Sequence, residues 1–210
     1  MRIRGLYVIA DTSILQDAVL ETKARQALSG GAEFIQYRDK SEDHNKRLRQ
    51  AKLLQGLCAE FDKCFIVNDD PELARQVGAA GVHIGDNDAT IEAARRVVGE
   101  SMIIGVSCYN RIELARDAER RGAQYVAFGS FFPSTVKPNA VRSTSRLLRQ
   151  ARKELSIPIV VIGGITYENG AGLIEAGADA LAVISAVFDQ SDVSLACKRL
   201  SGLFSSSGSL

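Results

Sequence analysis

Residues 31–40 read Gly-Ala-Glu-Phe-Ile-Gln-Tyr-Arg-Asp-Lys and combine a helix end, a strand and a polar cluster. Gly31 suits a helix C-terminus, because glycine adopts a left-handed conformation without a side-chain clash. The apolar residues 34–35 then begin a short strand, and long polar side chains follow at its exit. A helix followed directly by a buried strand is the repeating unit of an α/β protein.

The polar cluster places Gln36, Arg38 and Lys40 two residues apart, so on a strand these side chains share one face. Arginine offers a planar fork of donors and lysine a compact point charge, and both suit a doubly charged oxyanion such as a diphosphate. Two interpretations fit this pentapeptide alone: a site for a phosphorylated ligand, or the solvated start of a helix.

A weak internal repeat extends the pattern along the chain. Gly-Ala recurs at residues 31–32, 78–79, 122–123 and 177–178, each time just before an apolar run, so the period is two strand-helix units. Short apolar runs rich in Val, Ile, Phe and Tyr predict eight strands, at residues 6–10, 34–37, 64–67, 82–84, 102–106, 125–128, 159–162 and 181–184.

Four copies of a double unit predict the fold class, an α/β protein with a single-domain TIM (β/α)8 barrel rather than an open doubly wound sheet. No G-x-G-x-x-G motif follows the first strand, which further disfavours a dinucleotide-binding sheet. The 210 residues suit one domain, predicted over residues 1–204, with a disordered tail from Ser205 to Leu210.

The composition is that of an ordinary soluble globular protein, with 46% hydrophobic residues, 24% charged residues and a net charge of +1. Basic residues are interspersed with acidic ones, so no nucleic-acid partner is expected. The apolar runs are far shorter than the roughly 20 residues that cross a bilayer, so no membrane partner is expected. Four cysteines without a C-x-x-C pair, and no signal segment, favour a reducing cytoplasm. A homo-oligomer is left open.

In a barrel of this kind the chemistry lies at the C-terminal ends of the strands. Polar residues or glycines follow seven of the predicted strands there. Helix capping accounts for some of them, but not for the two cations after the second strand or the lysine-containing loop after the sixth. The candidates are Arg38, Lys40, Asn68 to Asp70, Asp86 to Asp88, Ser107, Ser134 to Lys137, Gly163, Gly164 and Ser185.

Two of these carboxylates, Asp69 and Asp88, stand at neighbouring strand ends and can share a hard cation. Mg2+ takes one or two carboxylates and leaves positions for water and phosphate oxygens. Asp70, before Pro71, is predicted to be a helix cap, and capping is an alternative for Asp88.

Other residues carry less specific signals. Gly163-Gly164 suits either a close backbone approach to a phosphate or a tight turn. His83 is predicted to be a hydrogen-bonded core residue and His44 to lie on a helix surface, and neither is predicted to be a catalytic base. Cys108 is predicted to be a small buried packing residue, and Asn110 with Glu113 predicts a capping box.

Taken together, the motifs resemble those of the thiamine phosphate synthase family over residues 5–188. The family joins 4-amino-2-methyl-5-hydroxymethylpyrimidine diphosphate to 4-methyl-5-(2-phosphooxyethyl)thiazole, giving thiamine monophosphate and pyrophosphate. In its mechanism pyrophosphate leaves first, and the thiazole nitrogen captures the pyrimidine methylene cation. The resemblance implies a transferase with Mg2+ as cofactor and these two small-molecule partners. The matching residues are 36–40, 66–69, 81–85 with Asp88, 105–107, 129–137, 162–165 and 183–185.

The resemblance also implies a role for each matching residue. The catalytic residues would be Arg38, Lys40, Ser107 and Lys137. The pyrimidine diphosphate would be held by Gln36, Arg38, Lys40, Asn68, Ser107 and Lys137, with Tyr37 and Asp39 of the same motif also substrate-binding. The thiazole phosphate would lie against Ser134, Thr135, Val136, Gly164, Ile184 and Ser185, and Mg2+ would be bound by Asp69 and Asp88.

Two positions depart from the family pattern. The family commonly has Thr-x-Thr-Lys where this chain has Ser134-Thr-Val136-Lys137, so one hydroxyl is missing and only the backbone of Val136 could reach the thiazole phosphate. The usual Gly-Gln pair after the fourth strand is Gly85-Asp86 here, which adds a carboxylate close to the expected metal.

Two rival functions use the same barrel. A thiazole tautomerase-like paralogue would use a histidine near the end of the fifth strand, where this chain has Ser107-Cys108-Tyr109. A non-catalytic barrel that binds a phosphorylated metabolite would not need the full set of Arg38, Lys40, the metal-binding aspartates and the lysine loop.

Arg38→Ala and Lys137→Ala are each predicted to lower turnover strongly while the barrel still folds. Each change removes a preorganised cation from the charge that builds on the departing pyrophosphate, and deletion of one such partner costs about 10²- to 10³-fold in rate. Steady-state turnover, together with circular dichroism to verify folding, checks this prediction. Near-normal turnover of either variant removes that residue from the mechanism.

Overall fold

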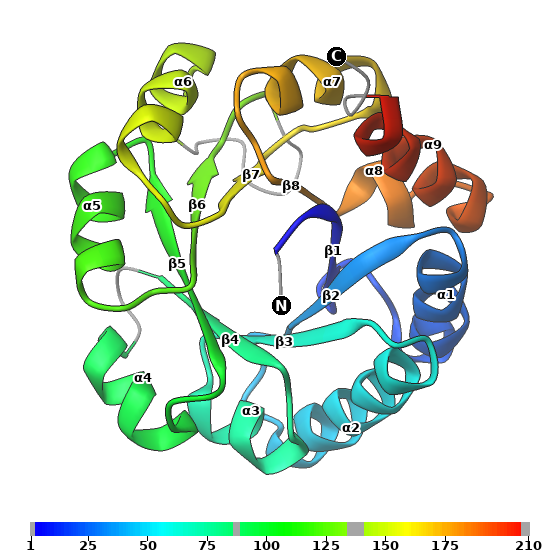
Figure 1. Ribbon diagram of the computed structural model, residues 1–210. Coiled ribbons are helices and arrows are strands. Elements are labelled where there is room, and N and C mark those ends of the chain that lie inside the picture. Colours follow the sequence, from blue (N-terminus) through cyan, green and yellow to red (C-terminus); the bar gives the residue numbers. More distant parts are fainter. Residues whose placement is uncertain (1–2, 86–88, 134–140, 207–210) are drawn as a thin grey trace.

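The computed structural model describes residues 3–85, 89–133 and 141–206, and within them eight parallel strands close into a barrel (Figure 1). The strands follow one another around the barrel in chain order, and β1 pairs with both β2 and β8. Helices in the connections form an outer ring. The predicted fold class, an α/β TIM barrel, is confirmed.

The strands lie within a few residues of their predicted positions. They are β1 Gly5–Asp11, β2 Ala32–Arg38, β3 Cys64–Asn68, β4 Gly81–Ile84, β5 Ile103–Tyr109, β6 Tyr125–Gly129, β7 Ile159–Ile162 and β8 Ala180–Val183. The helices are α1 Asp17–Ser29, α2 His44–Glu60, α3 Pro71–Val77, α4 Ile91–Val98, α5 Ile112–Arg120, α6 Ser145–Glu154, α7 Tyr167–Glu175, α8 Ser185–Phe188 and α9 Val193–Ser206.

The Gly-Ala repeat marks helix ends, as the sequence predicts. The φ angles are 96° at Gly31, 65° at Gly78, 86° at Gly122 and 114° at Gly177, values that residues other than glycine rarely adopt. Each of these glycines therefore lets the chain leave a helix and turn directly into β2, β4, β6 or β8.

The capping box predicted at Asn110 and Glu113 is wrong. Arg111 is the residue before α5, and it provides no side-chain cap. Asn110 instead donates its side-chain amide to the carbonyl of Arg142 at 3.2 Å. The side chain serves a tertiary contact between the end of β5 and residues 141–143, which local sequence cannot predict.

The strands are buried on both faces, as parallel strands covered by helices must be. Outward-facing side chains pack against the helices, and a second hydrophobic cluster fills the barrel interior. Tyr7, Phe34 and Tyr125 are the largest members of the interior cluster, and the rings of Tyr7 and Phe34 stack with their centroids 5.3 Å apart. These rings form a floor below the strand ends.

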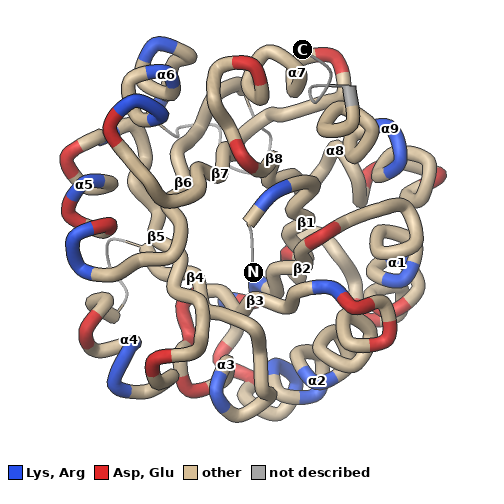
Figure 2. The backbone as a smooth tube through the Cα atoms, viewed as in Figure 1, with Lys and Arg blue, Asp and Glu red and all other residues tan. Residues whose placement is uncertain are grey.

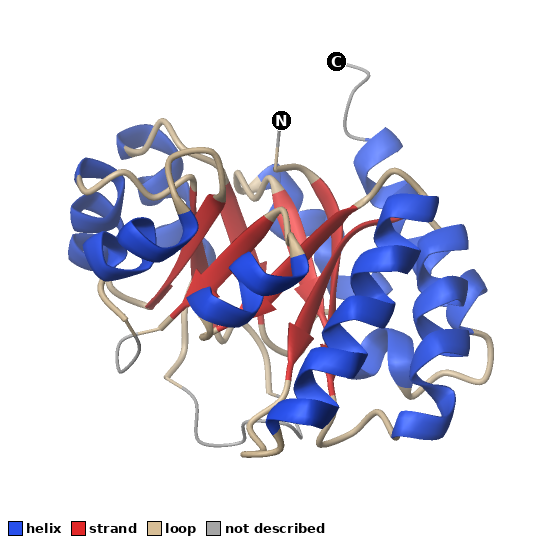
Figure 3. Ribbon diagram, turned by 90° about the horizontal axis from the view of Figure 1, so that it is seen from below, coloured by secondary structure: helices blue, strands red, loops and turns tan. Residues whose placement is uncertain are grey.

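All the strands run in the same direction, so their carboxyl ends meet on one side of the barrel (Figure 3). Acidic and basic residues are interspersed over the outer ring of helices (Figure 2). No helix in the described part of the chain is long and apolar enough to span a bilayer.

The C-terminal helix α9 reaches Ser206, so the first two residues of the predicted tail, Ser205 and Ser206, are helical. Residues 207–210 of that predicted tail lie outside the described residues.

Gly105→Ala is expected to destabilise the barrel by roughly 1–3 kcal/mol, the usual cost of overpacking a core. A Cβ atom on Gly105 would come within 1.9 Å of Cζ of Tyr125, and the ring is fully buried and cannot move aside. The free energy of unfolding from urea titrations measures the effect. Gly56→Ala is the matched control, because its Cβ would meet no atom within 4 Å and it lies inside α2. Equal stability of the two variants would show that the Gly105–Tyr125 contact is not tight.

Candidate active site

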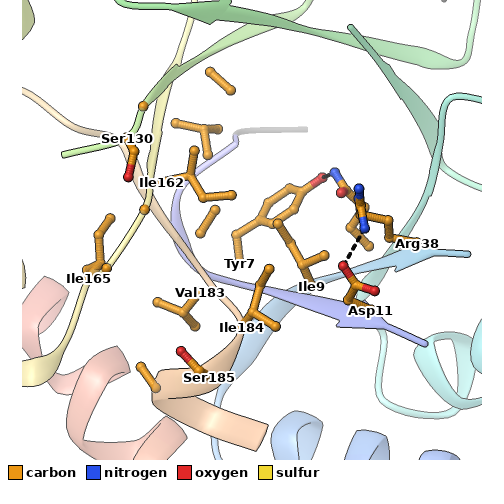
Figure 4. Close-up of a pocket in the computed structure, with 18 of the residues that line it drawn as sticks. Tyr7, Ile9, Asp11, Arg38, Ser130, Ile162, Ile165, Val183, Ile184 and Ser185 are labelled. Atoms are coloured by element: carbon orange, nitrogen blue, oxygen red, sulfur yellow. Dashed lines mark hydrogen bonds and ion pairs between the residues drawn. The ribbon is translucent and has the colours of Figure 1, made fainter. Parts of the chain in front are cut away.

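A cavity of about 730 Å³ opens where the carboxyl ends of the strands meet. Its floor is formed by aromatic and small apolar side chains, and polar side chains from β1 to β5 form part of its wall (Figure 4). Ser130, Gly163 and Gly164 line the part of the cavity beyond β6 and β7. A concave apolar pocket with a few convergent polar groups is the usual form of a small-molecule site.

Most of the predicted site residues that the structure describes converge on this cavity. Tyr37, Asp39, Lys40 and Asp69 do not line it, although Lys40 and Asp69 pair with each other beside it. Asp88 and the predicted Ser134, Thr135, Val136 and Lys137 lie outside the described residues, as does Asp86. The predicted residues that line the cavity are Gln36, Arg38, Asn68, Ser107, Gly164, Ile184 and Ser185.

Asp11 holds Arg38 in place at the cavity wall. Nη1 of Arg38 lies 2.5 Å from Oδ2 of Asp11, whose side chain is only 2% exposed (Figure 4). The other oxygen of Asp11 accepts from the backbone and the hydroxyl of Ser13. Sequence reasoning missed Asp11, although its place at the end of the first strand is the same signal that identified the other candidates.

The second cation, Lys40, forms an ion pair with Asp69. Asp69 has a φ of 65°, which turns the chain sharply after β3, and its amide donates to the carbonyl of His83 at 2.8 Å. Asp70, the next residue, caps α3 by accepting from the amide of Leu73, as predicted. The two neighbouring aspartates thus have separate tasks.

The carboxylate of Asp69, beside Lys40, is the kind of oxygen ligand that a hard cation such as Mg2+ binds. Asp69 is 21% exposed at its side chain, so one carboxylate oxygen can reach a solvated ion. No group of three or more potential metal-binding side chains occurs among the described residues, which rules out a dedicated all-protein cage within them. One or two carboxylates with water and phosphate oxygens match what Mg2+ usually requires.

Tyr37 and Asp39 lie on the outer side of the polar motif. Tyr37 packs in the outer hydrophobic cluster. Asp39 is 1% exposed at its side chain and accepts from Nζ of Lys46 at 2.8 Å, Oγ1 of Thr12 at 2.8 Å and the amide of Ser41 at 2.6 Å. The carboxylate therefore ties the segment between Arg38 and Lys40 to the turn after β1 and to α2.

This environment shifts the acidity of Asp39. Burial by itself would raise the pKa of the carboxyl group, but the donors Lys46, Ser41 and Thr12 together outweigh it and hold the pKa well below its ordinary range. Asp39 is therefore charged at neutral pH, and its three donors depend on that charge.

A chain of polar side chains crosses the cavity floor. Gln36, Tyr7, Tyr125, His83 and Ser107 are joined in that order by hydrogen bonds of 2.8–3.0 Å. His83 is hydrogen-bonded and buried, as predicted. Sequence reasoning missed Tyr7 and Tyr125, because a tyrosine within a strand looks like any other core aromatic until its hydroxyl partner is known.

The Gly163-Gly164 pair forms a tight turn against the residues that follow β6. Both glycines have positive φ angles, 104° and 62°. A Cβ on Gly163 would come within 1.9 Å of Oγ of Ser130, and one on Gly164 within 2.2 Å of the carbonyl of Pro133. Since Gly164 also lines the cavity, the turn exposes backbone rather than side chains to a ligand.

Comparisons with known proteins agree on one family. The family model described as thiamine monophosphate synthase matches residues 6–187. A thiamine-phosphate synthase of Nitrosococcus oceani is 50% identical over 191 residues, covering 91% of this chain and 88% of the relative. The enzyme of the same description from Chromobacterium violaceum is 50% identical over 203 residues, covering 97% of each chain.

Solved structures show the same relationship. A thiamine phosphate pyrophosphorylase from Pyrococcus furiosus superposes with a TM-score of 0.89 at 34% identity, covering 99% of this chain and 98% of that chain. A 3-hexulose-6-phosphate synthase superposes with a TM-score of 0.69 at 16% identity, covering 95% of this chain and 99% of that chain, and this likeness shows the fold alone.

Asp39→Asn is expected to destabilise the protein by roughly 1.5–3 kcal/mol at neutral pH, since hydrogen bonds to a charged group are lost. The pKa of Asp39 is depressed on folding, so its contribution is complete above the unfolded-state pKa of about 3.9 and is lost as pH falls below that value. The gap between wild type and variant should therefore shrink in acid. Denaturant titrations from pH 7 downward test this. Asp117→Asn is the control: this side chain is 44% exposed and pairs with Arg120 and Arg121, and its loss should change stability by less than about 1 kcal/mol, as surface ion pairs do. A gap that stays constant into acid would contradict the role of the Asp39 charge.

Proposed function

The chain belongs to the thiamine monophosphate synthase family, and on that premise we propose how its cavity holds two substrates and Mg2+. The protein has thiamine-phosphate synthase activity, and this activity transfers a pyrimidinylmethyl group, releases pyrophosphate and serves thiamine biosynthesis. The observation that carries the proposal is the convergence of Gln36, Arg38, Asn68 and Ser107 from three different strands on one cavity.

The pyrimidine diphosphate binds along β2, β3 and β5 in this proposal. Arg38 can present the nitrogens of its guanidinium that are not engaged by Asp11, while Asn68 and Ser107 add neutral donors. Lys40 lies next to them beyond the end of β2 and can reach the same oxygens by leaving Asp69. Lys137, outside the described residues, is proposed as a further cation for the diphosphate.

Tyr37 and Asp39 contribute to substrate binding indirectly in this proposal. Their positions support a role in fixing the segment that carries Arg38 and Lys40, because Asp39 is held by donors from the turn after β1 and from α2. A residue of this kind affects the substrate through the geometry of its neighbours.

We propose that Asp69 and Asp88 would hold Mg2+. When bound, the ion would neutralise charge that develops on the departing pyrophosphate. The position of Asp69 next to Lys40 supports this assignment, because one diphosphate can then contact the cation of Lys40 and the ion at Asp69 together. Asp86, two residues before Asp88, would add a further carboxylate close to the metal.

The thiazole phosphate is proposed to occupy the opposite end of the cavity, near Gly164, Ile184 and Ser185. Ile184 immediately precedes helix α8 and Ser185 begins it, so backbone amides are available there to a phosphate. Ser134, Thr135 and Val136 are proposed to complete this subsite from the loop after β6.

The reaction is proposed to proceed by dissociation. The bond between the pyrimidine methylene carbon and the diphosphate oxygen breaks with its electron pair going to pyrophosphate, and the lone pair of the thiazole nitrogen then forms the new C–N bond. No proton is transferred in either step, so no general base is required. Arg38 and Lys40 stabilise the charge on the leaving group, and Asp11 and Asp39 hold the segment that carries these two cations.

The tautomerase-like alternative receives no support from the described cavity. That function would use a histidine near the end of β5, whereas Ser107 and Tyr109 occupy the cavity wall there. The cavity-lining histidine, His83, lies on β4 and its ring nitrogens are engaged by Tyr125 and Ser107.

We also propose that the protein works in the cytoplasm, and its four cysteines, which are thiols in the structure, support a reducing compartment.

Pyrophosphate release tests the proposed function directly. Purified protein is given the pyrimidine diphosphate, the thiazole phosphate and Mg2+, with each component omitted in turn. Release is expected only with all three, and thiamine monophosphate should appear in equal amount. Binding of either substrate without release would leave a non-catalytic barrel as the better description.

The same assay with Asp69→Asn tests the metal site. The Mg2+ concentration that gives the half-maximal rate is expected to rise by roughly tenfold or more in the variant, since a ligand charge is lost. Asn tolerates the left-handed backbone of residue 69. Asp62→Asn is the matched control, because Asp62 also has a positive φ of 55° but is exposed away from the cavity. An unchanged Mg2+ titration for Asp69→Asn would remove Asp69 from the metal site.

A further inference from the structure

The hydrogen-bonded chain on the cavity floor links five strands of the barrel. Nε2 of Gln36 donates to the hydroxyl of Tyr7 at 2.9 Å, and the hydroxyls of Tyr7 and Tyr125 lie 3.0 Å apart. The hydroxyl of Tyr125 lies 2.9 Å from Nδ1 of His83. Nε2 of His83 lies 2.8 Å from Oγ of Ser107, at the cavity wall.

The direction of donation along this chain follows from proton counting. A tyrosine hydroxyl has one proton, and when it is buried that proton needs an acceptor, so Tyr7, which accepts from Gln36, gives its proton to Tyr125. For the same reason Tyr125, which accepts from Tyr7, donates its own proton to Nδ1 of His83, which is then unprotonated. The proton of a neutral His83 ring is therefore on Nε2, where it is donated to Ser107.

We propose that Tyr7, Tyr125 and His83 are positioning residues that fix Ser107 as a hydrogen-bond donor to the substrate. Ser107 accepts from His83, so its own proton is not used by the chain and can point into the cavity. The opposite direction would make Ser107 donate to His83 and present lone pairs to an anionic oxygen. The choice of donor or acceptor at Ser107 is thus set on the far side of the barrel, at Gln36.

Burial keeps this chain in one protonation state. Burial raises the pKa of both Tyr7 and Tyr125 above the ordinary tyrosine value, so neither hydroxyl gives up its proton at neutral pH. The rings cannot turn freely either. Tyr7 stacks on Phe34, and His83 stacks on Tyr125 with ring centroids 5.5 Å apart.

The link to the substrate rests on the proposed function, because it assumes that Ser107 contacts the diphosphate. The direction of hydrogen-bond donation from Gln36 to Ser107 does not rest on that assumption. A test in the ligand-free protein therefore separates the two claims.

The first experiment measures the proton on His83. Protein labelled with 15N-histidine gives signals from only two residues, His44 and His83, and His44→Gln assigns them. The expected result is an unprotonated Nδ1 and a protonated Nε2 at His83. In Tyr7→Phe the bias from Gln36 is removed, so an Nδ1-protonated population should appear. A proton on Nδ1 in the wild type, or an unchanged spectrum in Tyr7→Phe, would overturn the proposal.

Tyr37→Phe is the matched control for this spectrum. Tyr37 is also a buried tyrosine of a strand, and its hydroxyl lies 2.6 Å from Oε1 of Gln50 on the outer side of β2. The loss of a buried hydroxyl outside the chain should leave the His83 signals as in the wild type. A tautomer change in this variant would mean that general loosening of the barrel, and not the chain, controls His83.

The second experiment links the chain to ligand binding by a double-mutant cycle with inorganic pyrophosphate and Mg2+ as the probe. Ser107→Ala is expected to weaken binding roughly tenfold, the loss of one hydrogen bond to a charged group, and Tyr7→Phe severalfold. The double variant should bind like Ser107→Ala, because the effect of Tyr7 passes through Ser107. Full additivity overturns the proposal. Unchanged affinity in Ser107→Ala overturns only the diphosphate assignment of Ser107, and the tautomer result would still stand.

Discussion

Closure of the sheet is the constraint on which the site depends. β1 pairs with β2 on one side and with β8 on the other, so the carboxyl ends of strands that are far apart in sequence are held around one opening. Without that closure Tyr7 of β1 and Tyr125 of β6 could not lie 3.0 Å apart across the interior. Each strand needs to supply only one or two polar side chains, because the barrel brings them together.

The alternation of side chains in β2 divides the work of a single motif. Gln36 and Arg38 face the cavity, where one starts the floor chain and the other forms part of the wall. Tyr37 and Asp39 face outward and attach the same segment to its surroundings. A binding residue is held precisely only when its neighbours are fixed, and here Tyr37 and Asp39 fix the segment that carries Gln36 and Arg38.

Sequence reasoning found the fold and seven of the residues that line the described cavity, for physical reasons that also explain what it missed. Strand periodicity and the glycines before β2, β4, β6 and β8 are local signals, and they carry the fold. Arg38 and Ser107 stood out because polar residues at strand ends need an explanation. Asp11 carried the same strand-end signal and was nevertheless missed. Tyr7 and Tyr125 did not stand out, since their roles depend on partners 29 to 118 residues away that only the closed barrel brings into contact. The capping box predicted at Asn110 was wrong because the side chain of Asn110 has a partner distant in sequence, the carbonyl of Arg142.

Arg38 and Lys40, the two cations of the site that the structure describes, are each paired with a carboxylate. Arg38 faces the buried Asp11, and Lys40 faces Asp69, so neither cation has to be held by the fold unpaired. The two pairs differ in one respect. Asp11 is 2% exposed and tied to Ser13, so it remains with Arg38 as a fixed part of the wall, whereas the Lys40–Asp69 pair is more exposed and costs little to separate. In the proposed site, a dianionic ligand would therefore pair with Lys40 and a divalent cation with Asp69, and the net charge around these two residues would not change.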